Sequence, residues 1–99
     1  MVGSVNDVVG SKNIVAGDYN GVDGHLNTVA GSVNIVDGSV NGVIGNYNIV
    51  DGDYNKAQGD GNAIEGSVNT VAGNLNTIDN GYHNVIGGNQ NVIIGRAHV

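Results

Sequence analysis

Carboxylates and histidines are the side chains of this sequence that could act as acids, bases or metal ligands. Five carboxylates recur at steps of fourteen residues: Asp23, Asp37, Asp51, Glu65 and Asp79. A row of carboxylates could attract Ca²⁺, which binds through several oxygen ligands. The sequence lacks, however, the Gly-Gly-x-Gly-x-Asp unit of calcium-binding β-rolls. We therefore expect no metal and no cofactor, keep a calcium site as the weaker alternative, and interpret the row as a charged surface that favours solubility.

The other reactive residue types give little support to catalysis. The histidines His25, His83 and His98 occupy different positions of the repeat described below, so no pair of them is expected to meet. All five serines follow a glycine, which is typical of turns. The absence of cysteine excludes disulfides and cysteine-based zinc or redox sites. We expect that the protein is not an enzyme.

These residues belong to a seven-residue repeat, Gly-x-x-Asn-x-Val-x, that runs through the chain. Gly recurs every seven residues from Gly3 to Gly73, with Asn three places later and an apolar residue two places after the Asn. Asn80 is one extra residue, after which the pattern resumes at Gly81 and Gly88 and completes thirteen units. A short fixed period over a whole chain indicates a solenoid.

A seven-residue period is also typical of coiled coils, but the residue types exclude a helix. Every unit contains a Gly, which disfavours a helix by about 1 kcal/mol relative to Ala. The apolar position is usually Val or Ile, whose branched side chains favour strands. The Asn and apolar positions are two residues apart, so both side chains point to the same side of a strand. Because seven residues cannot close a ring with an interior, two units are needed for each coil.

We therefore predict an all-β fold, a two-sided parallel β-solenoid or β-roll, that occupies residues 1–99 as one domain. Each coil has 14 residues from two units, so thirteen units make about six to seven coils. Val and Ile columns should fill a thin core, and inward Asn side chains should form amide ladders from coil to coil. Gly should supply the corners, and we expect the extra Asn80 to fit in a corner with little change to the strands.

Alternate units must lie on opposite faces of such a coil, and the two faces differ. The five carboxylates lie on the face of the odd-numbered units, the odd face. The even-numbered units form the even face, which is almost uncharged and is interrupted only by Lys56 and Gln58. A flat apolar surface is typically a contact surface, and a regular lattice such as ice is a natural partner for a regular array. The candidate ice-binding residues are Ile14, Ala16, Thr28, Ala30, Gly42, Ile44, Thr70, Ala72 and Val85.

Charge and hydropathy exclude other partners. The net charge is -6 and the chain has only three basic residues, which cannot neutralise a phosphate backbone, so we expect no nucleic-acid partner. No apolar run approaches the roughly 20 residues of a membrane span, so we expect no membrane partner. No basic segment precedes an apolar stretch near Met1, and we therefore expect no signal peptide in this sequence.

The repeat resembles the plant ice-recrystallisation-inhibition domain of ryegrass-type antifreeze proteins. Segments 24–30 (Gly-His-Leu-Asn-Thr-Val-Ala) and 66–72 (Gly-Ser-Val-Asn-Thr-Val-Ala) carry the match, which covers essentially the whole chain. The resemblance implies a left-handed β-roll with a valine core and asparagine ladders. It also implies an extracellular, apoplastic monomer whose one flat face adsorbs to ice and slows its growth and recrystallisation without catalysis. The family's ice face is rich in Thr, Ser and Val, whereas the even face here has only Thr28 and Thr70 as hydroxyl residues.

Two other interpretations fit the same repeat. The heads of trimeric autotransporter adhesins use a similar seven-residue rhythm in a β-roll, and their apolar outer columns form a trimer interface. The position before each Asn is often apolar in this chain, as in Leu26, Val33 and Tyr47, and this favours such a module. A plain structural repeat, natural or engineered, is the third interpretation. The number of chains per particle distinguishes the adhesin-like trimer from a monomeric ice-binding protein.

Overall fold

The computed structural model describes residues 2–94, and within them it contains thirteen short strands and no helix. Most strands have three residues, because only the residues on either side of the apolar position and the apolar residue itself are extended. The strands are β1 (Asp7–Val9), β2 (Ile14–Ala16), β3 (Gly21–Asp23), β4 (Thr28–Ala30), β5 (Ile35–Asp37), β6 (Gly42–Ile44), β7 (Ile49–Asp51), β8 (Lys56–Gln58), β9 (Ala63–Ser67), β10 (Thr70–Ala72), β11 (Thr77–Tyr82), β12 (Val85–Gly87) and β13 (Val92–Ile94).

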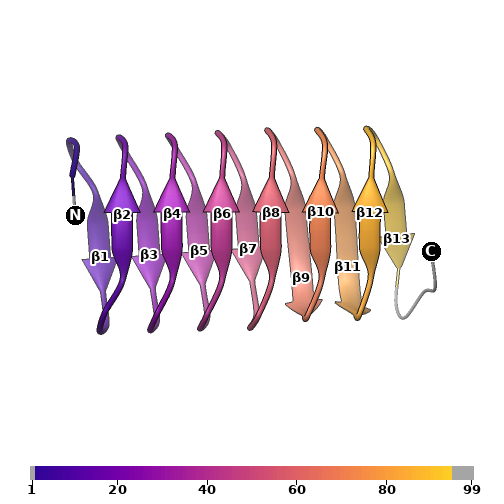
Figure 1. Cartoon of the computed structure of the whole chain (residues 1–99), viewed down its shortest axis with the longest axis horizontal. Helices are drawn as coiled ribbons and strands as arrows, with labels where there is room; N and C mark the ends of the chain where they lie inside the picture. Colours follow the sequence, from indigo (N-terminus) through magenta and orange to yellow (C-terminus); the bar gives the residue numbers. More distant parts are fainter. Residues whose placement is uncertain (1, 95–99) are drawn as a thin grey trace.

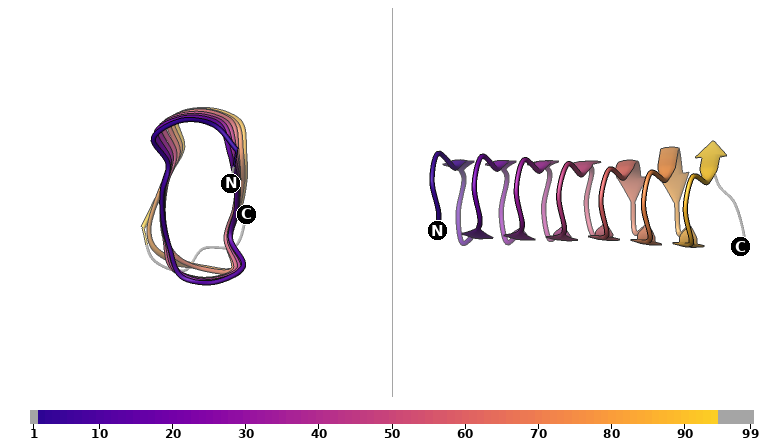
Figure 2. Two further views of the ribbon diagram at one scale, coloured as in Figure 1. Left: turned by 90° about the vertical axis from the view of Figure 1, so that its left-hand side faces the viewer. Right: turned by 90° about the horizontal axis from the view of Figure 1, so that it is seen from above.

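The strands form two parallel sheets that face each other across a thin interior (Figure 1). Odd-numbered strands make a seven-stranded sheet and even-numbered strands a six-stranded one, each in chain order. Neighbours pair in register at a separation of fourteen residues, as Val36 does with Val50, or of fifteen where the extra Asn80 lies between them, as Thr70 does with Val85. The predicted fold class and coil length are therefore confirmed. In the view along the solenoid the successive coils nearly superimpose (Figure 2).

The coil is left-handed. In Figure 1 the even-numbered strands lie in front and run upward, the odd-numbered strands lie behind and run downward, and the chain advances from left to right. Seen along the direction of advance, the chain therefore turns anticlockwise. This is the handedness that the family resemblance implied.

The core is a double column of side chains, one column from each sheet, and all of them are β-branched except Ala57. All of these residues are at most 3% exposed, and Val8 and Ile93 pack against them at the two ends. Burying one Val or Ile side chain contributes roughly 1.5–3 kcal/mol, so each coil has only two such contributions. The buried members are Val15, Val22, Val29, Val36, Val43, Val50, Ala57, Ile64, Val71, Ile78 and Ile86.

From Asn20 to Asn76 the Asn of each unit is buried beside this core and joins three coils. Asn48, which has no exposed surface, donates from Nδ2 to Asn34 Oδ1 (3.2 Å) in the preceding coil and to Gly59 O (2.8 Å) in the following one. Its Oδ1 accepts the backbone N–H of Asn62 at 2.9 Å. Each of these polar groups would otherwise be buried without a partner, which is costly. The predicted asparagine ladder is thus confirmed.

The corner Gly is required because the backbones of successive coils approach closely there. Gly45 has φ of 129°, a region that side chains disfavour. A Cβ at this position would overlap the carbonyl oxygen of Gly59 in the next coil. The close approach lets Gly59 donate its N–H to Ile44 O at 2.9 Å. The Gly of the repeat therefore serves coil-to-coil packing as well as the turn.

The residue before each Asn adopts a left-handed conformation, which sequence alternation did not predict. Its side chain is exposed, as expected. The cause is a φ near +60°, however, and not the alternation of side chains along a strand. Four valines occupy this position, although a left-handed backbone costs an ordinary residue roughly 1–2 kcal/mol. Val40, for example, has φ of 59° and donates its N–H to His25 O at 2.9 Å, which offsets part of that cost.

The extra residue Asn80 changes the strands more than expected. Strand β11 has six residues and β9 has five, and their register shifts between the pairs Ile78–Ile64 and Gly81–Gly66. The insertion is therefore a bulge in a lengthened strand, and the expectation that it would fit in a corner with little change to the strands is wrong. The asparagine ladder continues past it.

We predict that replacing Asn48 with Ala destabilises the protein by about 2–5 kcal/mol, because at least two buried groups lose their partners. Asn46→Ala is the matched control, since Asn46 is an amide in the same coil whose hydrogen bond from Ser32 N lies at the exposed surface, where water can replace it. Urea titration followed by circular dichroism measures both changes. Equal losses of unfolding free energy for the two variants would show that the buried ladder does not hold the coils together.

Candidate functional site

The even face is a regular array of two outward columns. Its strands β2, β4, β6, β8, β10 and β12 each direct the first and third residues outward and the middle residue into the core. The first column is Ile14, Thr28, Gly42, Lys56, Thr70 and Val85, and the second is Ala16, Ala30, Ile44, Gln58, Ala72 and Gly87. All nine candidate residues lie in these columns.

The register makes this array periodic. Thr28 lies beside Gly42, Ala30 beside Ile44, and Thr70 beside Val85 in neighbouring strands. Paired strands are about 4.8 Å apart, so equivalent atoms recur at that interval along each column. The core, the ladder and the backbone hydrogen bonds beneath fix the strands. The even face is therefore a rigid surface whose outward groups are mostly methyl and hydroxyl groups.

One strand interrupts the even face. Lys56 and Gln58 project from β8, and both are exposed. Between them Ala57 points into the core and is 1% exposed. The backbone of the face is therefore continuous through β8, and only two side chains break its small and uncharged character.

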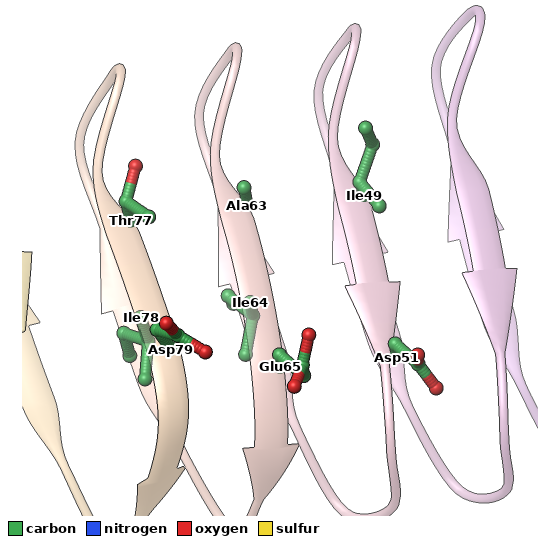
Figure 3. Close-up of a pocket in the computed structure, with 8 residues that line it drawn as sticks. All are labelled: Ile49, Asp51, Ala63, Ile64, Glu65, Thr77, Ile78 and Asp79. Atoms are coloured by element: carbon green, nitrogen blue, oxygen red, sulfur yellow. The ribbon is translucent and has the colours of Figure 1, made fainter. Parts of the chain in front are cut away.

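The odd face carries the predicted carboxylates. Asp23, Asp37, Asp51 and Glu65 pair in register, so they lie one above another. Asp79 follows on β11 beside the bulge and pairs with Ile94 on its other side, so it is not in strict register with Glu65. Figure 3 shows three of the carboxylates projecting from neighbouring strands.

The odd face also has an apolar column that the sequence analysis did not identify. It consists of Gly21, Ile35, Ile49, Ala63, Thr77 and Val92, and the charged Asp7 stands beside Gly21 at its N-terminal end. An open depression of about 350 Å³ lies between its members Ile49, Ala63 and Thr77 and the carboxylates (Figure 3). Sorting the first outward position of the odd units, as was done for the even units, would have found this column.

The carboxylates do not converge on a common point. Among residues 2–94, no group of three or more His, Asp and Glu side chains is placed to hold a metal ion. The calcium alternative therefore gains no support from the geometry. Neighbouring carboxylates in the row are instead like charges about 4.8 Å apart, and each pair repels by roughly 1 kcal/mol even in bulk water.

The corners contain a second set of side-chain hydrogen bonds, which sequence analysis interpreted only as turns. The residue after each Gly accepts the backbone N–H of its equivalent in the preceding coil where its side chain is long enough. Asn46 Oδ1 accepts from Ser32 (2.8 Å), Asp60 Oδ1 accepts from Asn46 (2.8 Å), and Asn74 Oδ1 accepts from Asp60 (2.9 Å). The recurrence of Asp and Asn at this position is the sequence feature that could have indicated these hydrogen bonds.

The two described histidines, His25 and His83, lie in different coils. His25 lies in a corner, where its Nδ1 accepts the backbone N–H of Ser11 at 3.0 Å. His83 makes an edge-to-face contact with Tyr82, with ring centroids 4.2 Å apart. His98 lies outside the described residues.

Comparisons add no family assignment. The chain matches no model of a protein family and no curated protein. Within the described part of the chain, no helix is long and apolar enough to cross a membrane.

We predict that Asp51→Asn stabilises the protein by about 1 kcal/mol at low ionic strength, because Asp51 lies between Asp37 and Glu65 in the row. The gain should shrink as salt screens the repulsion. Thermal unfolding at low and high NaCl measures both effects. The control is Asp53→Asn, which makes the same charge change in a corner outside the row. A salt-independent gain, or an equal gain for the control, would contradict the interpretation.

Proposed function

We propose that this protein binds ice through its even face and thereby slows ice growth and recrystallisation. The observation that carries the proposal is the pairing of a rigid, periodic, nearly uncharged face with a charged face on the opposite side. The left-handed coil, the valine core and the asparagine ladder support membership of the plant ice-recrystallisation-inhibition family that the repeat resembles.

Adsorption to ice requires geometry rather than reactivity. A crystalline surface offers no charge or cavity to recognise, so many weak contacts must form together over a flat area. A surface that is already ordered loses little conformational entropy when it binds. The Thr and Ala side chains of β4 and β10 are short, so few rotamers need to be fixed. No catalytic step or cofactor enters this function.

The odd face has a complementary role in this proposal. Its carboxylates are strongly hydrated, so this face stays in contact with liquid water while the even face lies on the crystal. A protein with two equally apolar faces would also associate with itself. The asymmetry of the solenoid thus favours a monomer that adsorbs in one orientation. Extracellular location is part of the proposal because it follows from the family resemblance.

The test places a bulky side chain on the even face. Thr28→Tyr or Thr70→Tyr should raise several-fold the protein concentration needed to inhibit recrystallisation in an annealed frozen film, because the ring holds the face away from the crystal. The circular dichroism spectrum should not change, since both threonines are exposed and project outward. Asp37→Tyr on the odd face is the control and should do little. A larger loss for Asp37→Tyr would assign the contact to the other face.

An adhesin-like trimer is the second candidate, and exposed apolar side chains at the corners favour it. Tyr19, Tyr47 and Tyr54 each have more than half of their surface exposed, at 62%, 67% and 62%. A trimer would cover such columns, whereas an ice-binding monomer would leave them in water. Sedimentation equilibrium distinguishes the two by the mass of the particle.

A further inference from the structure

We infer that Lys56 and Gln58 divide the proposed ice-binding face into two shorter surfaces and thereby limit its activity. The inference rests on the proposed function and concerns which residues set its strength. The nine candidate residues would form the contact with ice, whereas Lys56 and Gln58 would interrupt it.

The interruption falls inside the sheet rather than at its end. Lys56 lies between Gly42 and Thr70 in the first column. Strands β2, β4 and β6 lie on one side of it, and β10 and β12 lie on the other. The longest uninterrupted surface therefore spans three strands, although the even sheet has six.

In the second column, Gln58 lies between Ile44 and Ala72 in the same way. Both columns are therefore broken at the same strand, and no continuous strip of small uncharged groups bypasses β8. The two side chains act together as one barrier across the face.

Both the size and the hydration of these side chains oppose contact with a flat crystal. The Lys ammonium group is strongly hydrated and sits on a four-carbon stem, so it stands well above Gly42 and Thr70. Pressing it against a solid surface removes water from a charge, which is unfavourable without a partner. The Gln amide adds a second polar group that would lose water. Ice lying on β6 would therefore be held away from β10.

The neighbouring strands show what an uninterrupted β8 would contain. Strands β4 and β10 each present Thr in the first column and Ala in the second. Lys56→Thr with Gln58→Ala copies this pair onto β8. Because the two replaced side chains are exposed and Ala57 alone of this strand is buried, the core is unchanged.

The experiment compares wild type with the Lys56→Thr/Gln58→Ala double variant for inhibition of ice recrystallisation. The double variant should act at a concentration about tenfold lower, which corresponds to ~1.4 kcal/mol of binding free energy. Each single variant should give part of this gain. The single variants also keep the test decisive if the double variant loses its β-sheet circular dichroism signal.

Lys12→Gln is the matched control, because it removes the same positive charge from an exposed corner position outside the two columns. It should leave activity unchanged. If the wild type inhibits recrystallisation but neither the double nor the single variants inhibit it more strongly, this inference is overturned and the proposed function is not. An equal gain in Lys12→Gln would also overturn it, since net charge would then be the cause. Absence of ice activity in wild type and variants alike would overturn the proposed function and the inference with it.

Discussion

The close stacking of one coil on the next is the constraint on which the rest of the structure depends. Gly must occupy the corners from Gly3 to Gly73 because the carbonyl of the next coil lies where a Cβ would be. Asn must occupy the buried position because its amide spans the two interfaces of its coil, as Asn48 does with Asn34 and Gly59. The thin core contributes only two β-branched residues per coil. Hydrogen bonds between coils therefore contribute strongly to holding the coils in register. This register makes both faces periodic.

Most of the fold could be predicted because the same local solution is repeated thirteen times. The period of seven, the β-branched position and the Gly in every unit were enough to derive strands, corners, coil length and the buried amides. The left-handed conformation of the residue before Asn could not be predicted, because a valine such as Val40 gives no local signal for a φ of 59°. That conformation is imposed by the hydrogen bonds of the stacked coils. The bulge at β11 could not be predicted either, because the sequence does not distinguish a residue inserted in a corner from one inserted in a strand.

The positions of the surface residues could be predicted as well as the fold. Parity alone placed the nine even-face residues and the carboxylates in columns. The paired registers agree with those positions, except that Asp79 lies beside the bulge and does not pair with Glu65. The apolar column through Ile35 and Ile49 was missed because only one outward position of the odd units was considered. The link to ice rests on the flatness and low charge of one face and on the resemblance of the repeat.

The two faces give a physical account of how one small solenoid could adsorb in a single orientation, with β4 and β10 toward the crystal and the carboxylates toward water. The most direct measurement attaches a fluorescent dye to the odd face through Asp37→Cys, since the chain has no cysteine of its own. A single ice crystal is then grown slowly in the labelled protein. The account predicts that fluorescence enters the ice in a pattern that follows particular crystal planes. Exclusion of the labelled protein into the liquid, as for free dye, would contradict it.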